Sequence, residues 1–193
     1  MIRKAIITDA KSIYAVFANN VLDRARMSDF AYQEYVQKEG FILGSETEGD
    51  FKNYISEYPY FFVHENKGKI LGFLCANNKR DYLDDEYKFW LDENAKNIYY
   101  NNQNSSVLDM VVVDKNQHTH GIGSKLLKYF EKQLTKDGYR YLFSIVRFLP
   151  LTNCASILFH TKHRFSRVAS SKPRPLYGVE NAASFLYYKE LNK

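Results

Sequence analysis

The chain has few cysteines and no long apolar segment. Its 193 residues include two cysteines, Cys75 and Cys154, which lie far apart and fit no metal-ligand spacing. We therefore expect reduced thiols in a cytoplasmic protein. No apolar run approaches the roughly 20 residues of a membrane-spanning helix. The first residues, MIRKAIITDA, lack the apolar core of a signal peptide. These absences argue against a disulfide scaffold and against a membrane protein.

A concentrated block of positive charge is missing as well. The formal net charge is +5, and the lysines and arginines are scattered along the sequence. Nucleic-acid-binding proteins usually gather basic residues on one face, so we expect no nucleic acid partner. The charge does suit a small anionic ligand. Hydrophobic residues make up 45% of the chain, and we see no repeat or linker, so we expect one soluble domain over residues 1–193.

The hydrophobic pattern predicts mixed helices and strands. Residues 107–113, VLDMVVV, are nearly all apolar, as expected for a strand buried on both faces. An apolar stripe at every fourth position, ended by Gly138, predicts an amphipathic helix over Ile122, Leu126, Phe130 and Leu134. Further helices are expected near 10–17, 28–40, 51–56 and 153–163, and further strands at 2–7, 60–64, 69–76, 139–146, 164–169 and 184–190. Residues 78–104 are polar and irregular and are expected to form an insertion with a short helix, and residues 171–183 a loop.

The stretch HTHGIGSKLL places two glycines at the start of that amphipathic helix. Backbone N–H groups at a helix start have no intrahelical partner and lie at the positive end of the helix dipole, so they can bind an anion. Gly121 and Gly123 have no Cβ, which lets a pyrophosphate approach these amides. The same glycine pattern is also common in ordinary turns. It is neither a P-loop, which ends in Gly-Lys-Ser/Thr, nor a Rossmann fingerprint, which has an earlier glycine and an acidic strand end.

The longer segment VVVDKNQHTHGIGSKLL resembles the acetyl-CoA-binding segment of the GNAT acyltransferases. That motif is Arg or Gln, two residues, Gly, one residue, and Gly or Ala, directly after a buried strand. Gly121 and Gly123 match it, whereas His118 stands at the Arg/Gln position. A second segment, NCASILFHTKHRF, resembles the later helix of the family through Asn153, Ser156, Phe159 and Phe165. In that segment His160 occupies a position often held by tyrosine, and Arg164 replaces a glycine.

The resemblance implies a GNAT-like α+β fold. Its central sheet would be mixed but mostly antiparallel, with about seven strands, flanked by helices and splayed between two central strands. Acetyl-CoA would be the co-substrate, with no metal. Its pantetheine arm would pair with the backbone of Val111, Val112 and Val113, and its adenine end would lie near Asn153. The loop residues assigned to the cofactor are His118, Thr119, His120, Gly121, Ile122, Gly123 and Ser124.

Acyl transfer to an amine requires a base, a donor to the carbonyl oxygen, and a proton for the departing thiolate. The resemblance suggests a backbone N–H near Val111 as the donor. His160, as an imidazolium, is the candidate acid, and Asp109 is the candidate base, directly or through water. Two plainer interpretations stay open: His160 as a partly exposed helix histidine, and Asp109 as a structural carboxylate at a strand edge.

We therefore predict an enzyme that moves an acetyl group from acetyl-CoA to a primary amine of a small molecule or peptide, acting as a monomer or homodimer. A non-catalytic acyl-CoA-binding or regulatory module is the alternative, motivated by the departures at His118 and Arg164. A less favoured hypothesis is a metal site formed by His118, His120, His160 and His163, because structural zinc sites usually include cysteine. The acidic and aromatic residues 81–93 could wall the acceptor site and attract a cationic amine, although a solvated helix face is the preferred interpretation.

Overall fold

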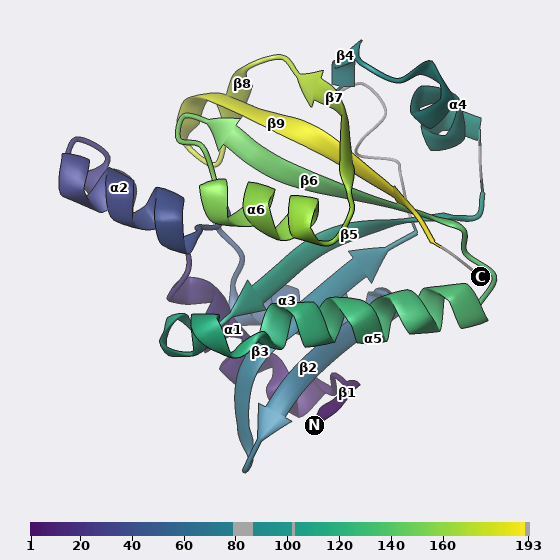
Figure 1. Cartoon of the computed structure of the whole chain (residues 1–193). Coiled ribbons are helices and arrows are strands. Elements are labelled where there is room, and N and C mark those ends of the chain that lie inside the picture. The colour runs from purple at the N-terminus through teal and green to yellow at the C-terminus, as the bar shows by residue number, and fades with distance from the viewer. Residues whose placement is uncertain (79–86, 102, 192–193) are drawn as a thin grey trace.

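The computed structural model describes residues 1–78, 87–101 and 103–191, and residues 118 and 119 by their backbone alone. Its strands form a sheet in the order β1-β2-β3-β5-β6-β9-β7-β4, with β8 paired to β9 (Figure 1). Within these residues β5 and β6 are parallel neighbours, and the other neighbouring strands are antiparallel. The strands are β1 (Ile2–Lys4), β2 (Tyr60–Asn66), β3 (Lys69–Asn77), β4 (Tyr87–Trp90), β5 (Ser105–Val113), β6 (Tyr141–Leu149), β7 (Ser166–Ser171), β8 (Arg174–Leu176) and β9 (Val179–Glu190).

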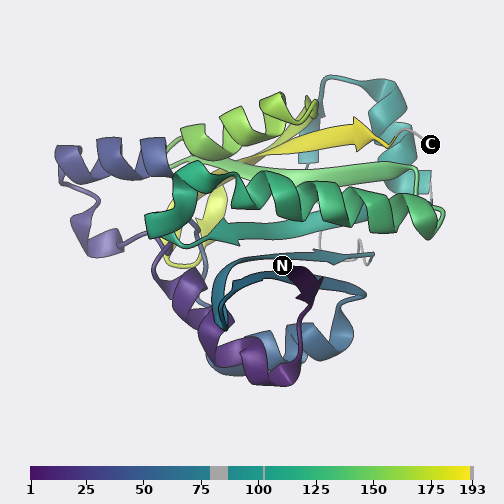
Figure 2. The same cartoon turned by 60° about the horizontal axis from the view of Figure 1, so that its bottom comes forward.

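Helices cover both faces of this sheet, which confirms the predicted α+β class. Alternate residues of β3 point to opposite faces, so Phe73 packs with α1 (Ala10–Ala18) and α3 (Glu48–Glu57), whereas Leu74 packs with α5 (Ile122–Lys136). Figure 2 shows α5 on one side of β2 and β3, and α1 and α3 on the other. The remaining helices are α2 (Phe30–Glu39), α4 (Glu93–Asn101) and α6 (Cys154–Lys162). No helix in the described residues is long and apolar enough to cross a membrane.

Several helix boundaries follow from the local signals in the sequence. The stripe predicted for α5 is buried along its whole length, from Ile122 to Leu134. Asp29 begins α2 by accepting a hydrogen bond from the Tyr32 backbone N–H at 3.1 Å. Gly40 ends α2 with a φ of 91°, a conformation that favours glycine. The predicted helix at 51–56 begins earlier, because Thr47 caps the N-terminus of α3.

Three regions differ from the sequence prediction. The strand expected at 2–7 ends at Lys4, and Ile7 begins the 3-10 turn Ile7–Asp9. The expected loop at 171–183 contains β8 and the start of β9, which turn at Tyr177 and Gly178, both with positive φ. Within the predicted insertion, the expected short helix is α4, and β4 adds a strand beyond β7. The sheet therefore has nine strands in its described part, where about seven were expected. The extra strands are short, so they carry little hydrophobic periodicity.

The two central strands separate halfway along their length. β5 and β6 pair from Ser105 with Tyr141 as far as Leu108 with Ser144. Beyond that point β5 stays paired with β3 as far as Val113, and β6 with β9 as far as Leu149. Figure 1 shows the two strands diverging, with α6 beside the opening. The predicted splay is therefore confirmed, and it begins at Asp109 and Ile145.

Candidate active site

Two neighbouring cavities lie along the gap between β5 and β6. The larger has a volume of about 370 Å³ and is lined by the end of β5, the start of α5, one side of α6 and the segment after α2. The smaller has a volume of about 160 Å³ and lies between β5, β6 and the segment that follows α2. The residues that line both cavities are Phe41, Ile42, Val111, Val112, Asn153 and Ser156. The gap therefore joins two spaces into one elongated site.

The backbone of β5 is directed into this gap at alternate residues. The Asp114 N–H donates to the Leu71 carbonyl at 2.9 Å, so residues two and four positions earlier also face β3. Val111 and Val113 then direct their backbone N–H and C=O groups toward the gap, and Val112 does not. The Val113 carbonyl accepts a hydrogen bond from Asn20 at 3.1 Å. Asn20 is buried and lines the larger cavity, and no motif in the sequence indicated it.

Gly121 and Gly123 are glycines for different structural reasons. Gly121 has a φ of 67° and no atom within 4 Å of the position of a Cβ, so its role is conformational. Gly123 has little room: a Cβ there would lie 3.3 Å from the ring of Phe159 and 3.6 Å from Val113 Cγ2. Both glycines line the larger cavity, together with Ser124. The predicted loop residues 121, 123 and 124 therefore come together at this cavity.

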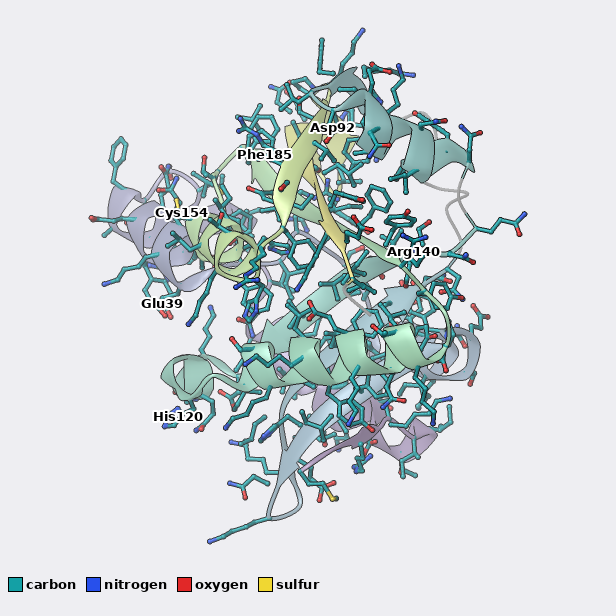
Figure 3. All side chains as sticks on the ribbon, turned by 45° about the vertical axis from the view of Figure 1, so that its right-hand side comes forward. Glu39, Asp92, His120, Arg140, Cys154 and Phe185 are labelled. Carbon is teal, nitrogen blue, oxygen red and sulfur yellow. The ribbon has the colours of Figure 1, made fainter. Side chains whose placement is uncertain are left out.

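The other predicted loop residues are placed differently. His118 and Thr119 belong to the 3-10 turn Lys115–His120, but their side chains lie outside the described part of the structure. His120 is exposed and lines neither cavity, and Figure 3 shows it at the end of the molecule beside the start of α5. The Ile122 side chain is buried in the core, which leaves its backbone N–H as the group that could face a ligand.

Ser124 and Asn153 are held by partners that the sequence did not reveal. Ser124 Oγ lies 2.9 Å from His163 Nε2, so the start of α5 is joined to the end of α6. Asn153 caps α6 by accepting from the Ser156 N–H at 3.1 Å, and its Nδ2 donates to the Phe41 carbonyl at 2.8 Å. The amide of Asn153 thus connects α6 to the segment after α2, at the junction of the two cavities.

His160 is more buried than the partly exposed helix histidine that one interpretation of the sequence expected. It is 2% exposed, and burial lowers its pKa to about 4. Its Nδ1 lies 2.7 Å from the Ser156 carbonyl, an acceptor, so the proton of the neutral ring belongs on Nδ1. Its Nε2 therefore accepts from Ser144 Oγ at 2.8 Å. This corrects two predictions: His160 is not a partly exposed histidine, and at neutral pH it is not an imidazolium.

Asp109 is the first residue of β5 beyond its pairing with β6, and it lines the smaller cavity. Burial raises its pKa to about 6, and a hydrogen bond from Tyr58 at 3.2 Å acts in the opposite direction. The charge of Glu46 raises the pKa further, and that of Arg147 lowers it. At neutral pH the carboxylate is deprotonated, but its affinity for a proton is higher than usual. Such a group suits proton transfer from a bound ligand.

Other residues of the smaller cavity were not identified from the sequence. They are Glu46 from the segment between α2 and α3, Arg147 and Ser144 from β6, and Tyr177 from the turn between β8 and β9. No sequence motif marks Glu46, Ser144 or Arg147, and Tyr177 belongs to a region that was expected to be a loop. Local sequence patterns do not report which distant segments meet across a gap.

The predicted acidic insertion and the histidine metal site fit the structure less well. Residues 87–93 line neither cavity, and residues 81–86 lie outside the described residues. Asp92 lies far from His120 in Figure 3. His160 and His163 each hydrogen-bond a different serine, and the described residues hold no group of three or more potential metal ligands. Cys75 is buried, Cys154 is exposed, and both are free thiols.

Comparisons with known proteins concern the family and the fold. A sequence model described as the acetyltransferase (GNAT) family matches residues 27–165. The fold is similar to an N-acetyltransferase from Staphylococcus aureus, with a TM-score of 0.66 and 21% identity, covering 100% of this chain and 98% of that one. It is also similar to the ribosomal-protein-alanine N-acetyltransferase from Brucella melitensis, with a TM-score of 0.62 and 18% identity over 99% of both chains.

A third similar structure is the paia N-acetyltransferase from Thermoplasma acidophilum in complex with coenzyme A, with a TM-score of 0.61 and 15% identity over 98% of both chains. No curated protein sequence matches the chain. At these identities the likeness to solved structures concerns the fold alone.

Proposed function

The chain belongs to the acetyltransferase (GNAT) family, whose members are acyl-CoA-dependent N-acetyltransferases, and on this premise we propose that it transfers an acetyl group from acetyl-CoA to a primary amine. The observation that carries the proposal is the gap between β5 and β6. It presents the backbone of Val111 between a larger and a smaller cavity. The larger cavity would take the CoA arm, and the smaller one a small-molecule or peptide amine. The proposed acyl transfer needs no metal, and we propose none.

The residues at the larger cavity fit acetyl-CoA, which would supply the activated acyl group. A Cβ at Gly123 would narrow the cavity against Phe159 and Val113. We propose that the pyrophosphate is held by the backbone N–H groups of Gly121, Ile122, Gly123 and Ser124, where the dipole of α5 is positive. The turn through His118, Thr119 and His120 would contribute through its backbone, and the Val111 carbonyl and the Val113 N–H would pair with the pantetheine arm. Asn153 would shape this site by holding the Phe41 carbonyl and α6.

Asp109 is the proposed base for the amine. An amine enters as an ammonium ion and must lose a proton before its nitrogen can attack. The deprotonated Asp109, with a pKa of about 6, accepts that proton. The Val111 N–H is the proposed donor to the carbonyl oxygen. As the new N–C bond forms and the C–S bond breaks, one of the two protons lost by the nitrogen ends on the CoA thiol and the other leaves to solvent.

His160 receives a different role from the predicted one. With its proton on Nδ1 and a pKa of about 4, it has no proton on Nε2 to donate to the thiolate. We propose that it is a positioning residue that fixes the hydroxyl of Ser144, at the point where β5 and β6 separate. The lone pairs of Ser144 Oγ would then face the small cavity in one orientation.

An acceptor screen tests the proposed function. Purified protein is incubated with acetyl-CoA and separate panels of polyamines, aminoglycosides, amino acids and peptide N-termini, and the free CoA thiol is measured. We expect thiol release with at least one class, and a decrease of about 100-fold in Asp109→Asn, a typical contribution of a general base. Glu57→Gln, an exposed carboxylate on α3, is the matched control. CoA binding without thiol release on any panel would instead support the non-catalytic binding module.

A further inference from the structure

The smaller cavity contains a second carboxylate, Glu46, whose environment differs from that of Asp109. Its Oε2 is buried and has no hydrogen-bond partner among the described residues. Burial raises the pKa of Glu46, and nearby backbone N–H groups and Tyr177 only partly offset this. A buried acceptor atom without a partner is costly unless a ligand supplies the missing donor.

The fold leaves room for this carboxylate. A Cβ at Gly44 would collide with Glu46 Oε2 and would lie 3.0 Å from the ring of Phe17. Gly44 is buried, and its φ lies outside the left-handed region, so its missing side chain matters for space and not for backbone conformation. The glycine therefore allows the carboxylate to lie against the wall of the cavity.

Charge distinguishes the two carboxylates. The charged residues that line the small cavity are Glu46, Asp109 and Arg147. The charge of Arg147 lowers the pKa of Asp109, whereas no cationic side chain contributes to the pKa of Glu46. Arg147 is thus a cationic neighbour of Asp109, whereas the charge that acts most on Glu46 is that of another carboxylate, Asp50. With both carboxyl groups ionised, the described lining of the cavity would carry one negative charge in excess.

We propose that Glu46 is the specificity-determining residue of the acceptor site, and that it binds a second ammonium group of a small diamine. This inference rests on the proposed function. The nitrogen that reacts becomes neutral when Asp109 removes its proton and stays neutral in the amide product. A separate anchor therefore needs a positive charge that persists through the reaction, which a second ammonium group provides. The cavity volume of about 160 Å³ suits a short acceptor.

Three acceptors of equal chain length test this specificity. Putrescine has a second ammonium group on its fourth carbon, butylamine has hydrogen in its place, and in γ-aminobutyrate the fourth carbon is a carboxylate. The free CoA thiol is measured to give kcat/KM for each acceptor. We expect putrescine to exceed butylamine by about 10- to 100-fold, the value of one hydrogen-bonded charge pair, and γ-aminobutyrate to be the poorest acceptor.

Two isosteric variants isolate the contribution of Glu46. In Glu46→Gln the preference for putrescine over butylamine should fall to about 3- to 10-fold, mainly through KM, because charge-assisted hydrogen bonds are about twice as strong as neutral ones and the free-energy difference is therefore about halved. Glu48→Gln removes a half-buried carboxylate two residues away, paired with Lys52, and should keep the preference. Calorimetric CoA binding by Glu46→Gln shows that this variant is folded.

Each alternative result has a distinct meaning. Equal rates for putrescine and butylamine in the native protein, or an undiminished preference in Glu46→Gln, would overturn the inference and leave the proposed function standing. A preference for γ-aminobutyrate would overturn it in favour of Arg147 as the anchor. Thiol release from none of the amine panels would refute the proposed function itself, and this inference with it.

Discussion

Asp109 and His160 should change the stability of the protein with pH in opposite directions. Burial raises the pKa of Asp109 from 3.8 to about 6 and lowers that of His160 from 6.5 to about 4. Each pH unit corresponds to about 1.4 kcal/mol, so each group alters the free energy of unfolding by about 3 kcal/mol over its window.

Burial disfavours the charged form of both groups. The stability changes have opposite signs because a carboxyl group becomes charged as the pH rises and an imidazole becomes charged as the pH falls. Asp109 costs stability as the pH rises from about 4 to about 6, since the unfolded carboxyl ionises first. His160 costs stability as the pH falls from about 6.5 to about 4, since the unfolded imidazole is protonated first. The two contributions nearly cancel in the native protein, and each should appear when the other group is removed.

Urea unfolding followed by circular dichroism at pH 4, 5, 6 and 7 measures this. Relative to the native protein, Asp109→Asn should gain about 3 kcal/mol between pH 4 and pH 7, and His160→Gln should gain about the same as the pH falls across that range. The difference from the native protein at each pH removes the contribution of other titrating groups. If either variant follows the native curve in parallel, the assigned burial of that group is wrong.

Three further predictions concern the ligand sites. Gly123→Glu should abolish CoA binding in calorimetry, because a carboxylate would enter the cavity beside Phe159 and meet the phosphates; unchanged affinity would refute the assignment of the loop. The kcat/KM for amine acetylation should rise with pH through an inflection near 6 if Asp109 must be deprotonated. That inflection should be absent from the residual activity of Asp109→Asn. Metal analysis of protein purified without a histidine tag should find no stoichiometric zinc, and one equivalent would revive the four-histidine hypothesis.

The fold was predictable from the sequence where the signal was local. The stripe of α5, the Asp29 cap and Gly40 each define a boundary with neighbouring residues alone. The glycines at 121 and 123 could likewise be assigned to the start of a helix. Only the structure shows why each position is a glycine: Gly121 has a positive φ, and Gly123 packs closely against Phe159.

The lining of the small cavity was not predictable, because its residues are distant from one another in the sequence. Glu46, Arg147 and Tyr177 come from three distant segments that meet only when β5 and β6 separate. His160 lies on a helix whose apolar and polar residues alternate irregularly, so its burial left no periodic pattern. Sequence reasoning named the residue but placed it in the wrong environment, and its protonation state was wrong as a result.

The separation of β5 and β6 creates a sheet edge in the interior of the molecule. An exposed strand edge readily pairs with another chain, and proteins usually protect it. Here the edge at Val111 and Val113 lies within the sheet and is enclosed by α6 and the segment after α2. We expect a narrow extended molecule with amide groups to pair with this edge as a strand would. Because α6 and the segment after α2 lie beside it, the edge is less accessible to another chain than the outer strands of the sheet.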